Sequence, residues 1–221
     1  ETLINVFALA HEMGHAIHSY YSDKTQPYIY AGYKIFVAEV ASTCNEALLI
    51  DHLLKNTNDK KQKAYLINHF LEKFRGTLYR QTMFAEFEML THRMVENGES
   101  LTADALCKLY HELNVKYYGN EIVVDPEIDM EWARIPHFYK YFYVYQYATG
   151  FSAAIAISRR ILNEGAPAVN DYIKFLSSGS SNYPIELLKI AGVDMSTTEP
   201  VNQALKLFAE LLDEMEELMN N

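Results

Sequence analysis

The residues best suited to catalysis are His11, Glu12 and His15, which lie in the segment HEMGH. Two histidines four residues apart project from one face of a helix, where both imidazoles can bind the same metal ion. The glutamate lies about 100° around the helix from His11, where it can take a proton from a metal-bound water. This is the H-E-x-x-H pattern of zinc peptidases, in which the ion lowers the pKa of its water toward about 7 and polarises the scissile carbonyl. The segment therefore predicts a hydrolytic zinc site.

A catalytic zinc ion needs a third protein ligand and one open coordination position. The metzincin continuation H-x-x-G-x-x-H is excluded, because His18 and Tyr21 occupy the positions of its Gly and last His. The next predicted helix offers Glu39 and Glu46, which are two helical turns apart and share a face. We expect Glu39, near the start of that helix, to bind the metal. Glu46 would then accept a hydrogen bond that orients an imidazole.

Two neighbours of the motif are expected to have structural roles. His18 lies three residues beyond His15 on the metal-facing side, where packing or support of a ligand is a more ordinary role than direct coordination. Gly14 has no side chain, so another backbone can approach the helix closely at that position.

Long helices must position these residues. The chain has only 9 Gly and 6 Pro among 221 residues, so few residues interrupt regular structure. Apolar periodicity and end signals predict helices at about residues 2–21, 34–55, 58–97, 102–119, 142–163, 167–177, 184–191 and 200–219. Loops are expected over 22–33 and 120–136, the latter with one helical turn at most. The predicted fold is all-α, without an internal linker, and packs the H-E-x-x-H helix on the helix that carries Glu39.

Composition excludes several classes of function. Nineteen basic and 29 acidic residues give a net charge of −10, which argues against nucleic acid or an anionic membrane as partner. No apolar run approaches the roughly 18 residues of a membrane span, and no basic leader precedes an apolar segment. Cys44 and Cys107 are far apart and form no C-x-x-C pattern, as expected for reduced thiols. We expect a cytoplasmic protein.

Several segments resemble a known family. HEMGHAIH at 11–18, followed by FVAEVAS at 36–42, is similar to the H-E-F-G-H-x-x-H and F-x-E-x-P-S patterns of the thimet-type oligopeptidases. IPHFY at 135–139 and FYVYQYATG at 142–150 are most similar to the oligoendopeptidase F branch of that family. One position departs from the pattern, since Ala41 stands where many members have proline.

The resemblance spans essentially the whole chain and implies a zinc metalloendopeptidase that cleaves short oligopeptides. It implies one Zn²⁺ bound by His11, His15 and Glu39, with Glu12 as the general base. Family members are considerably longer, and the motif lies in their C-terminal part. Residues 1–221 are therefore expected to be the C-terminal catalytic domain of a longer chain. Its partners would be oligopeptide substrates and the missing N-terminal part of the same protein.

Tyrosine occupies every second position over residues 139–147. Such alternation is typical of a strand, but the small residues that follow favour a helix, so we expect a loop over 137–141 that leads into a helix. Peptide hydrolysis forms a tetrahedral oxyanion, which an additional hydrogen-bond donor stabilises. The resemblance implies a histidine and tyrosines of this segment in that role, and we expect His137, Tyr143 and Tyr145. Aromatic packing, with each hydroxyl bonded to the backbone, is the alternative.

A metallocarboxypeptidase of similar helical fold is one alternative function. It would also contain H-E-x-x-H and a later glutamate, but it needs a cation that binds the free C-terminus of its substrate. The sequence names no such cation clearly. Arg159 and Arg160 could bind a peptide carboxylate, but a solvated helix end is the more ordinary place for such a pair.

A helical binding module with a structural metal is the other alternative. A structural zinc site uses four protein ligands and leaves no open position. The fourth ligand would then be His18 or Cys44.

Overall fold

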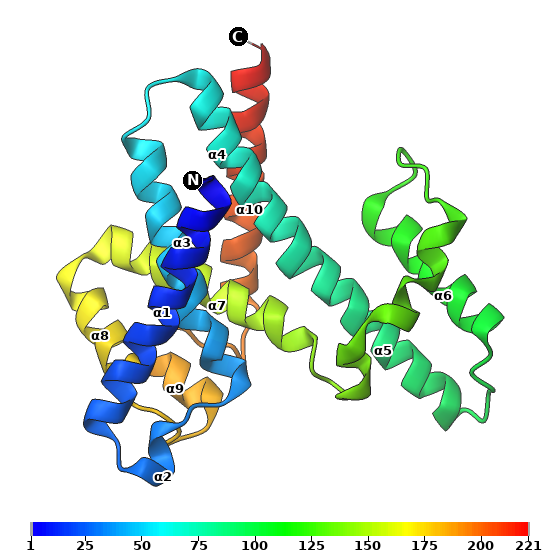
Figure 1. Ribbon diagram of the computed structural model, residues 1–221, viewed down its shortest axis with the longest axis horizontal. Helices are drawn as coiled ribbons and strands as arrows, with labels where there is room; N and C mark the ends of the chain where they lie inside the picture. The colour runs from blue at the N-terminus through cyan, green and yellow to red at the C-terminus, as the bar shows by residue number, and fades with distance from the viewer. Residues whose placement is uncertain (1, 221) are drawn as a thin grey trace. The chain divides into compact units, whose positions relative to one another are not determined.

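The computed structural model describes residues 2–220, which form helices and no strand (Figure 1). The α-helices are α1 (Leu3–Thr25), α2 (Tyr28–Ala31), α3 (Ile35–Lys55), α4 (Lys60–Lys73), α5 (Arg80–Glu96), α6 (Ala103–Tyr118), α7 (Tyr145–Glu164), α8 (Ala166–Leu176), α9 (Pro184–Ile190) and α10 (Glu199–Asn220). A π-helix, η1 (Phe74–Tyr79), and two 3₁₀-helices, η2 (Pro126–Arg134) and η3 (Pro136–Tyr139), complete them. The predicted all-α fold is confirmed.

The structure differs from the sequence prediction in two segments expected to be loops. Helix α1 continues to Thr25, whose hydroxyl donates to the carbonyl oxygen of Tyr21 at 2.7 Å, and α2 follows within the predicted loop. The region 120–136 contains the whole of η2, which at nine residues exceeds the single helical turn expected there. Pro126 and Pro136 each begin a 3₁₀-helix. Proline suits the first turn of a helix, because the backbone N–H that it lacks would have no hydrogen-bond partner there.

The helix predicted over 58–97 consists of α4, η1 and α5 in succession. A π-helix adds a residue per turn and changes which side chains share a face, so a single periodicity could not describe the whole segment.

The chain forms two compact units. Unit 1 contains the residues up to 74 and those from 149 onward, and unit 2 contains residues 75–148. Both boundaries lie inside helical segments, η1 and α7, so no linker marks them in the sequence. No helix among residues 2–220 is long and apolar enough to cross a membrane.

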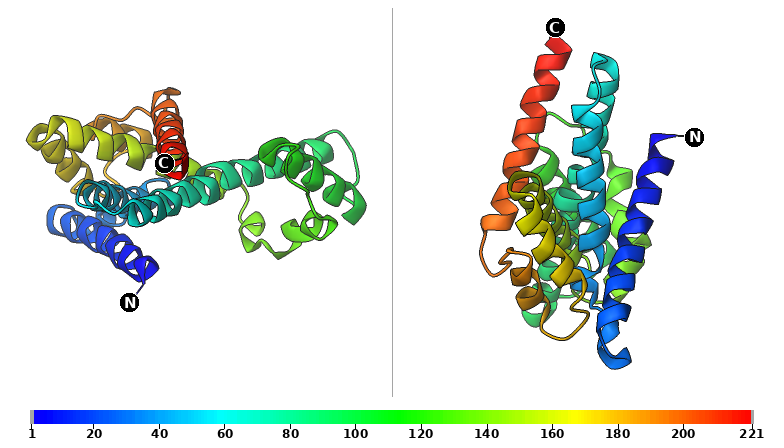
Figure 2. Two further views of the ribbon diagram at one scale, coloured as in Figure 1. Left: turned by 90° about the horizontal axis from the view of Figure 1, so that it is seen from above. Right: turned by 90° about the vertical axis from the view of Figure 1, so that its left-hand side faces the viewer.

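In unit 1, α1 packs lengthwise against α3, as Figures 1 and 2 show. The opposite side of α3 faces the core. That core combines α3 with α7, α8 and α9 through buried apolar side chains, among them Val37, Val40, Ala41, Ala153, Ile157, Phe175 and Leu188. Helix α3 thus lies between α1 and the core of unit 1, and contacts on both of its sides fix its position.

In unit 2, α5 and α6 pack together around Met83, Phe84, Phe87, Tyr110 and Leu113. The buried carboxylate of Glu131 accepts hydrogen bonds from the Tyr110 hydroxyl at 2.6 Å and from the guanidinium groups of Arg80 and Arg134. These bonds fix η2 against the two helices.

Candidate metal centre

The glycine of the HEMGH segment lies where α1 meets α3. A Cβ atom at Gly14 would lie 2.5 Å from the Cα of Ser42 and 2.7 Å from the carbonyl oxygen of Ala41. The Asn45 side chain of α3 donates to the carbonyl oxygen of Ala10 in α1 at 2.6 Å. Glycine therefore lets the two backbones approach more closely than any other residue would allow. This approach brings the adjacent turn of α3, which carries Glu39, beside the two histidines.

Three predicted ligands meet on adjoining faces of these helices. The Nε2 atoms of His11 and His15 lie 3.3 and 3.6 Å from Oε2 of Glu39, and the candidate ligand atoms all lie within 4.8 Å of one another. Each side chain is between 27 and 29% exposed, so the cluster is open to solvent on one side. Two imidazoles and one carboxylate are a donor set that zinc accepts in peptidases, and the grouping fits one ion.

Two further side chains orient the cluster. Oε1 of Glu46 lies 2.5 Å from Nδ1 of His11, which directs the other ring nitrogen, Nε2, toward Glu39. The Ser42 hydroxyl donates to Oε2 of Glu39 at 3.1 Å. Carboxylates and hydroxyls in such positions select the tautomer and hold the ring or carboxylate in a binding orientation.

The carboxylates also control the charge of the cluster in the metal-free chain. Hydrogen bonds from the His11 ring to the carboxylates of Glu39 and Glu46 raise the pKa of His11 to about 9. The hydrogen bond with His11 lowers the pKa of Glu39 below its usual value. A divalent cation bound here would meet the ionised carboxylate of Glu39 and would have to displace a proton from His11.

Glu12 and His18 occupy different environments on α1. Glu12 is exposed and forms no hydrogen bond or ion pair with the residues that the structure describes. His18 is 1% exposed and stacks on the ring of Tyr33, with ring centroids 3.7 Å apart. Burial lowers the pKa of His18 to about 4, so it is neutral. Glu12 is thus available to a bound substrate, whereas His18 belongs to the packing of unit 1.

Among the residues that the structure describes, the cluster offers three candidate protein ligands and no fourth. Within residues 2–220, His11, His15 and Glu39 are the one group of at least three suitable side chains close enough to bind an ion together. Cys44 is fully buried in the core of unit 1. Neither His18 nor Cys44 therefore completes a closed structural site, and this observation disfavours the binding-module alternative.

The other predicted site residues belong to unit 2, where an aromatic cluster surrounds His137. The His137 ring stacks on Tyr143, with centroids 5.4 Å apart, and the Tyr147 hydroxyl lies 3.5 Å from Nε2 of His137. Tyr145, the first residue of α7, is 41% exposed. The structure thus places Tyr147 with His137 and Tyr143. In the sequence, the four-residue spacing between Tyr143 and Tyr147 is the one indication that these two rings lie together. The tyrosines at every second position hide that indication.

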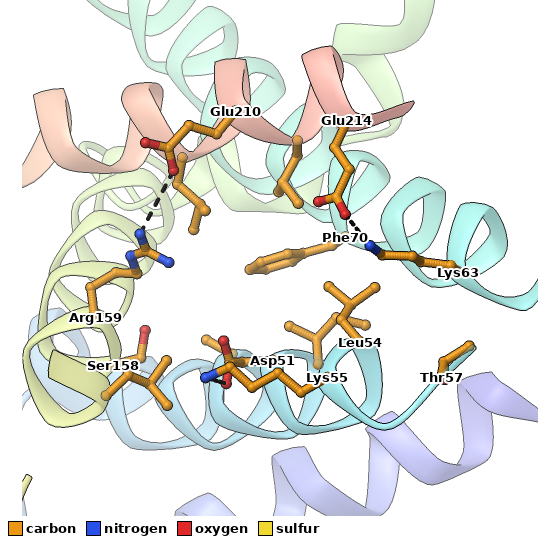
Figure 3. A pocket seen from close by; sticks show the side chains of 15 residues that line it. Asp51, Leu54, Lys55, Thr57, Lys63, Phe70, Ser158, Arg159, Glu210 and Glu214 are labelled. Atoms are coloured by element: carbon orange, nitrogen blue, oxygen red, sulfur yellow. Dashed lines mark ion pairs between the residues drawn. The ribbon is translucent and has the colours of Figure 1, made fainter. Parts of the chain in front are cut away.

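The two arginines considered for carboxylate binding are engaged within unit 1. Arg160 donates to Ala191, Glu164 and Asp171. Nη2 of Arg159 lies 3.7 Å from Glu210, at the edge of a pocket between α3, α4, α7 and α10 (Figure 3). None of the three predicted metal ligands lines that pocket. Both arginines thus have partners within unit 1, which gives no support to a role in binding the C-terminus of a substrate.

Comparison with known proteins places this chain in a family. The model of peptidase family M3 matches residues 2–207. The chain is 60% identical over 215 residues to oligopeptidase PepF of Bacillus subtilis (strain 168), covering 97% of this chain and 32% of that protein. It is 49% identical over 218 residues to the chromosomal oligoendopeptidase F of Lactococcus lactis subsp. cremoris, covering 99% of this chain and 36% of that protein.

A solved structure agrees with these relatives. The crystal structure of oligoendopeptidase-F from Enterococcus faecium superimposes with a TM-score of 0.88 at 46% identity, over 99% of this chain and 40% of that one. The chain thus spans between about a third and two fifths of the length of the proteins it matches.

Proposed function

This chain belongs to peptidase family M3, and we propose that it is the catalytic domain of a zinc-dependent metalloendopeptidase that cleaves internal bonds of short oligopeptides. The observation that carries the proposal is the grouping of His11, His15 and Glu39, to which residues 2–220 add no fourth candidate ligand. Such a site leaves a coordination position for chemistry. The relatives named as oligopeptidases support the substrate class.

The proposed mechanism assigns a separate task to each side chain. A zinc ion held by His11, His15 and Glu39 would supply Lewis acidity, lowering the pKa of a water molecule and polarising the peptide carbonyl. Glu12 takes a proton from the water as it attacks and passes that proton to the leaving amine. Its exposure and lack of partners among the described residues support this role.

We propose that the residues around His137 stabilise the oxyanion. Imidazole and phenol groups can donate hydrogen bonds to a developing negative charge, and His137, Tyr143 and Tyr145 are the residues expected from the sequence. Tyr147 joins this set on geometry, because its hydroxyl lies 3.5 Å from His137 in unit 2.

The tyrosines can be ranked by single hydroxyl deletions. Tyr147→Phe should lower kcat by about 10²-fold, the lower part of the range for loss of one oxyanion donor, with a much smaller change in KM. Tyr145→Phe should show the same loss if its hydroxyl also donates, and wild-type kinetics would remove it from the site. Steady-state kinetics on a peptide substrate measures both. A wild-type kcat for Tyr147→Phe would contradict its inclusion.

We propose that the complete enzyme contains further chain that packs on unit 1, because the relatives are about three times as long as this chain. Helix α1 carries a stripe of exposed apolar side chains at steps of three and four residues: Val6, Leu9, Met13, Ile17 and Tyr20. Such a stripe normally packs against another part of a protein. We propose a cytoplasmic enzyme, consistent with a chain whose Cys44 and Cys107 are both free.

Metal removal tests the proposed function. Cleavage of a quenched fluorescent peptide should cease with a zinc chelator and return when zinc is added. A C-terminally amidated peptide should be cleaved as well as the free acid, because an endopeptidase does not require a terminal carboxylate. Cleavage that survives chelation would refute the proposal, and a strict requirement for the free carboxylate would favour a carboxypeptidase.

A further inference from the structure

Glu46 connects the metal cluster to a third helix. Its Oε1 atom lies 2.5 Å from Nδ1 of His11, and its Oε2 atom lies 2.9 Å from Nζ of Lys73, the last residue of α4. The Glu46 side chain is only 10% exposed. Each carboxylate oxygen therefore has a charged or polar partner, one on α1 and the other on α4.

Helix α4 holds Lys73 in a defined place. Three of its apolar residues, Leu66, Ile67 and Phe70, are buried in unit 1. One turn before Lys73, the ring of His69 packs against Phe7 of α1, with centroids 4.4 Å apart. The end of α4 is thus anchored against the same helix that carries the two histidine ligands.

The contact of Glu46 with His11 depends on its contact with Lys73. A buried carboxylate that loses a charged partner tends to reorient, because an unsatisfied buried oxygen is costly. If Lys73 holds Oε2, rotation of the carboxylate is restricted and Oε1 stays directed at Nδ1 of His11. If that bond fails, Glu46 can turn toward solvent or another donor, and the His11 ring is no longer fixed.

We propose that Lys73 is a positioning residue for the metal site, acting through Glu46 to hold the His11 ring with Nε2 directed at Glu39. Lys73 touches neither His11 nor the other ligands in this role, and it takes no part in bond making. The inference rests on the proposed zinc-dependent function, but it concerns zinc affinity, which is measured without any substrate.

The test compares lysine variants on one helix. Lys73→Met removes the ammonium group and keeps the apolar stem, whereas Lys73→Arg keeps a cation. Lys63→Met is the matched control, because Lys63 also lies on α4 and its side chain is 33% exposed, against 39% for Lys73. Lys63 pairs with Glu214 of α10 (Figure 3), which is not one of the residues around the metal cluster. Zinc dissociation constants are measured on the complete protein by competition with a chromophoric chelator, and thermal melting monitors folding.

Removing a residue that hydrogen-bonds a metal ligand usually lowers metal affinity about 10–100-fold. Lys73 contacts Glu46 and not the ligand itself, so Lys73→Met should have a smaller effect and weaken zinc binding about threefold to tenfold. Lys73→Arg and Lys63→Met should bind zinc as the wild type does. Adding Lys73→Met to a Glu46→Gln variant should cause no further loss, because the pathway through Glu46 is already broken. With zinc in excess, kcat of Lys73→Met should return close to the wild-type value.

Three outcomes would overturn the inference. These are wild-type zinc affinity in Lys73→Met, an equal loss in Lys63→Met, or a full additional loss in the double variant. Absence of zinc binding by the wild type would instead refute the proposed function itself. If Lys73→Met lowers the melting temperature strongly, the comparison of Lys73→Arg with Lys73→Gln decides, since both keep a polar side chain and only the first keeps the charge.

Discussion

Replacing Glu12 by Gln should lower peptide hydrolysis by about 10²–10⁴-fold, the usual contribution of general acid–base catalysis, while zinc stays bound. Glutamine has nearly the shape of glutamate but cannot accept the proton from water. Glu12 is exposed and makes no hydrogen bond or ion pair with the described residues, so its replacement should leave α1 and the three ligands in place. The loss should therefore appear in kcat and not in metal content.

Two measurements on the same preparation decide this prediction, namely kcat on a quenched fluorescent peptide and zinc per chain by atomic absorption. Asp23→Asn is the control, because Asp23 is also an exposed acidic residue of α1 and lies about three turns from Glu12. It should keep wild-type activity. Hydrolysis retained by Glu12→Gln would refute the general base, and loss of zinc would show that Glu12 binds the metal.

Replacing Gly14 by Ala should both destabilise the protein and weaken zinc binding. The added methyl group would lie 2.5 Å from the Cα of Ser42 and 2.7 Å from the carbonyl oxygen of Ala41, and backbone atoms cannot move aside as a side chain can. Overpacking usually costs about 1–3 kcal/mol, and we expect the upper end of that range here. Because α1 and α3 must separate, Glu39 would move away from the histidines and zinc affinity should fall.

Chemical denaturation gives the free energy of unfolding, and chelator competition gives the zinc affinity. Gly32→Ala provides the control, since a Cβ there would meet no atom within 4 Å and the backbone φ of −70° suits alanine. That variant should be as stable as the wild type or slightly more so. Wild-type stability together with wild-type zinc affinity in Gly14→Ala would contradict the close helix approach as the basis of the site.

Much of the fold could be read from periodicity. Helices α1 and α3 follow from apolar spacing and the scarcity of glycine and proline, and the H-E-x-x-H spacing by itself places His11 and His15 on one face of α1. Glu39 lies nearer than Glu46 to the start of the predicted helix, which favours it as the candidate ligand, and the structure places Glu39 beside both Nε2 atoms.

Contacts between distant helices could not be predicted in the same way. The pairing of Lys73 with Glu46 depends on how α4 crosses α3, which no local pattern encodes. The π-helix at 74–79 changes which side chains of the following helix share a face. The 3₁₀-helices begin at prolines, and a proline in a sequence can mark either the start of a helical turn or a break in one. Tyr147 cannot be singled out from the sequence, because tyrosine occupies every second position over residues 139–147.

The central claim is that His11, His15 and Glu39 bind one zinc ion together. Anomalous X-ray scattering from zinc-loaded crystals, collected above and below the zinc absorption edge, tests it most directly. The account predicts a single strong peak within bonding distance of Nε2 of His11, Nε2 of His15 and a carboxylate oxygen of Glu39. A peak bound by Glu46 or His18 in place of Glu39, or no peak beside the two histidines, would contradict it.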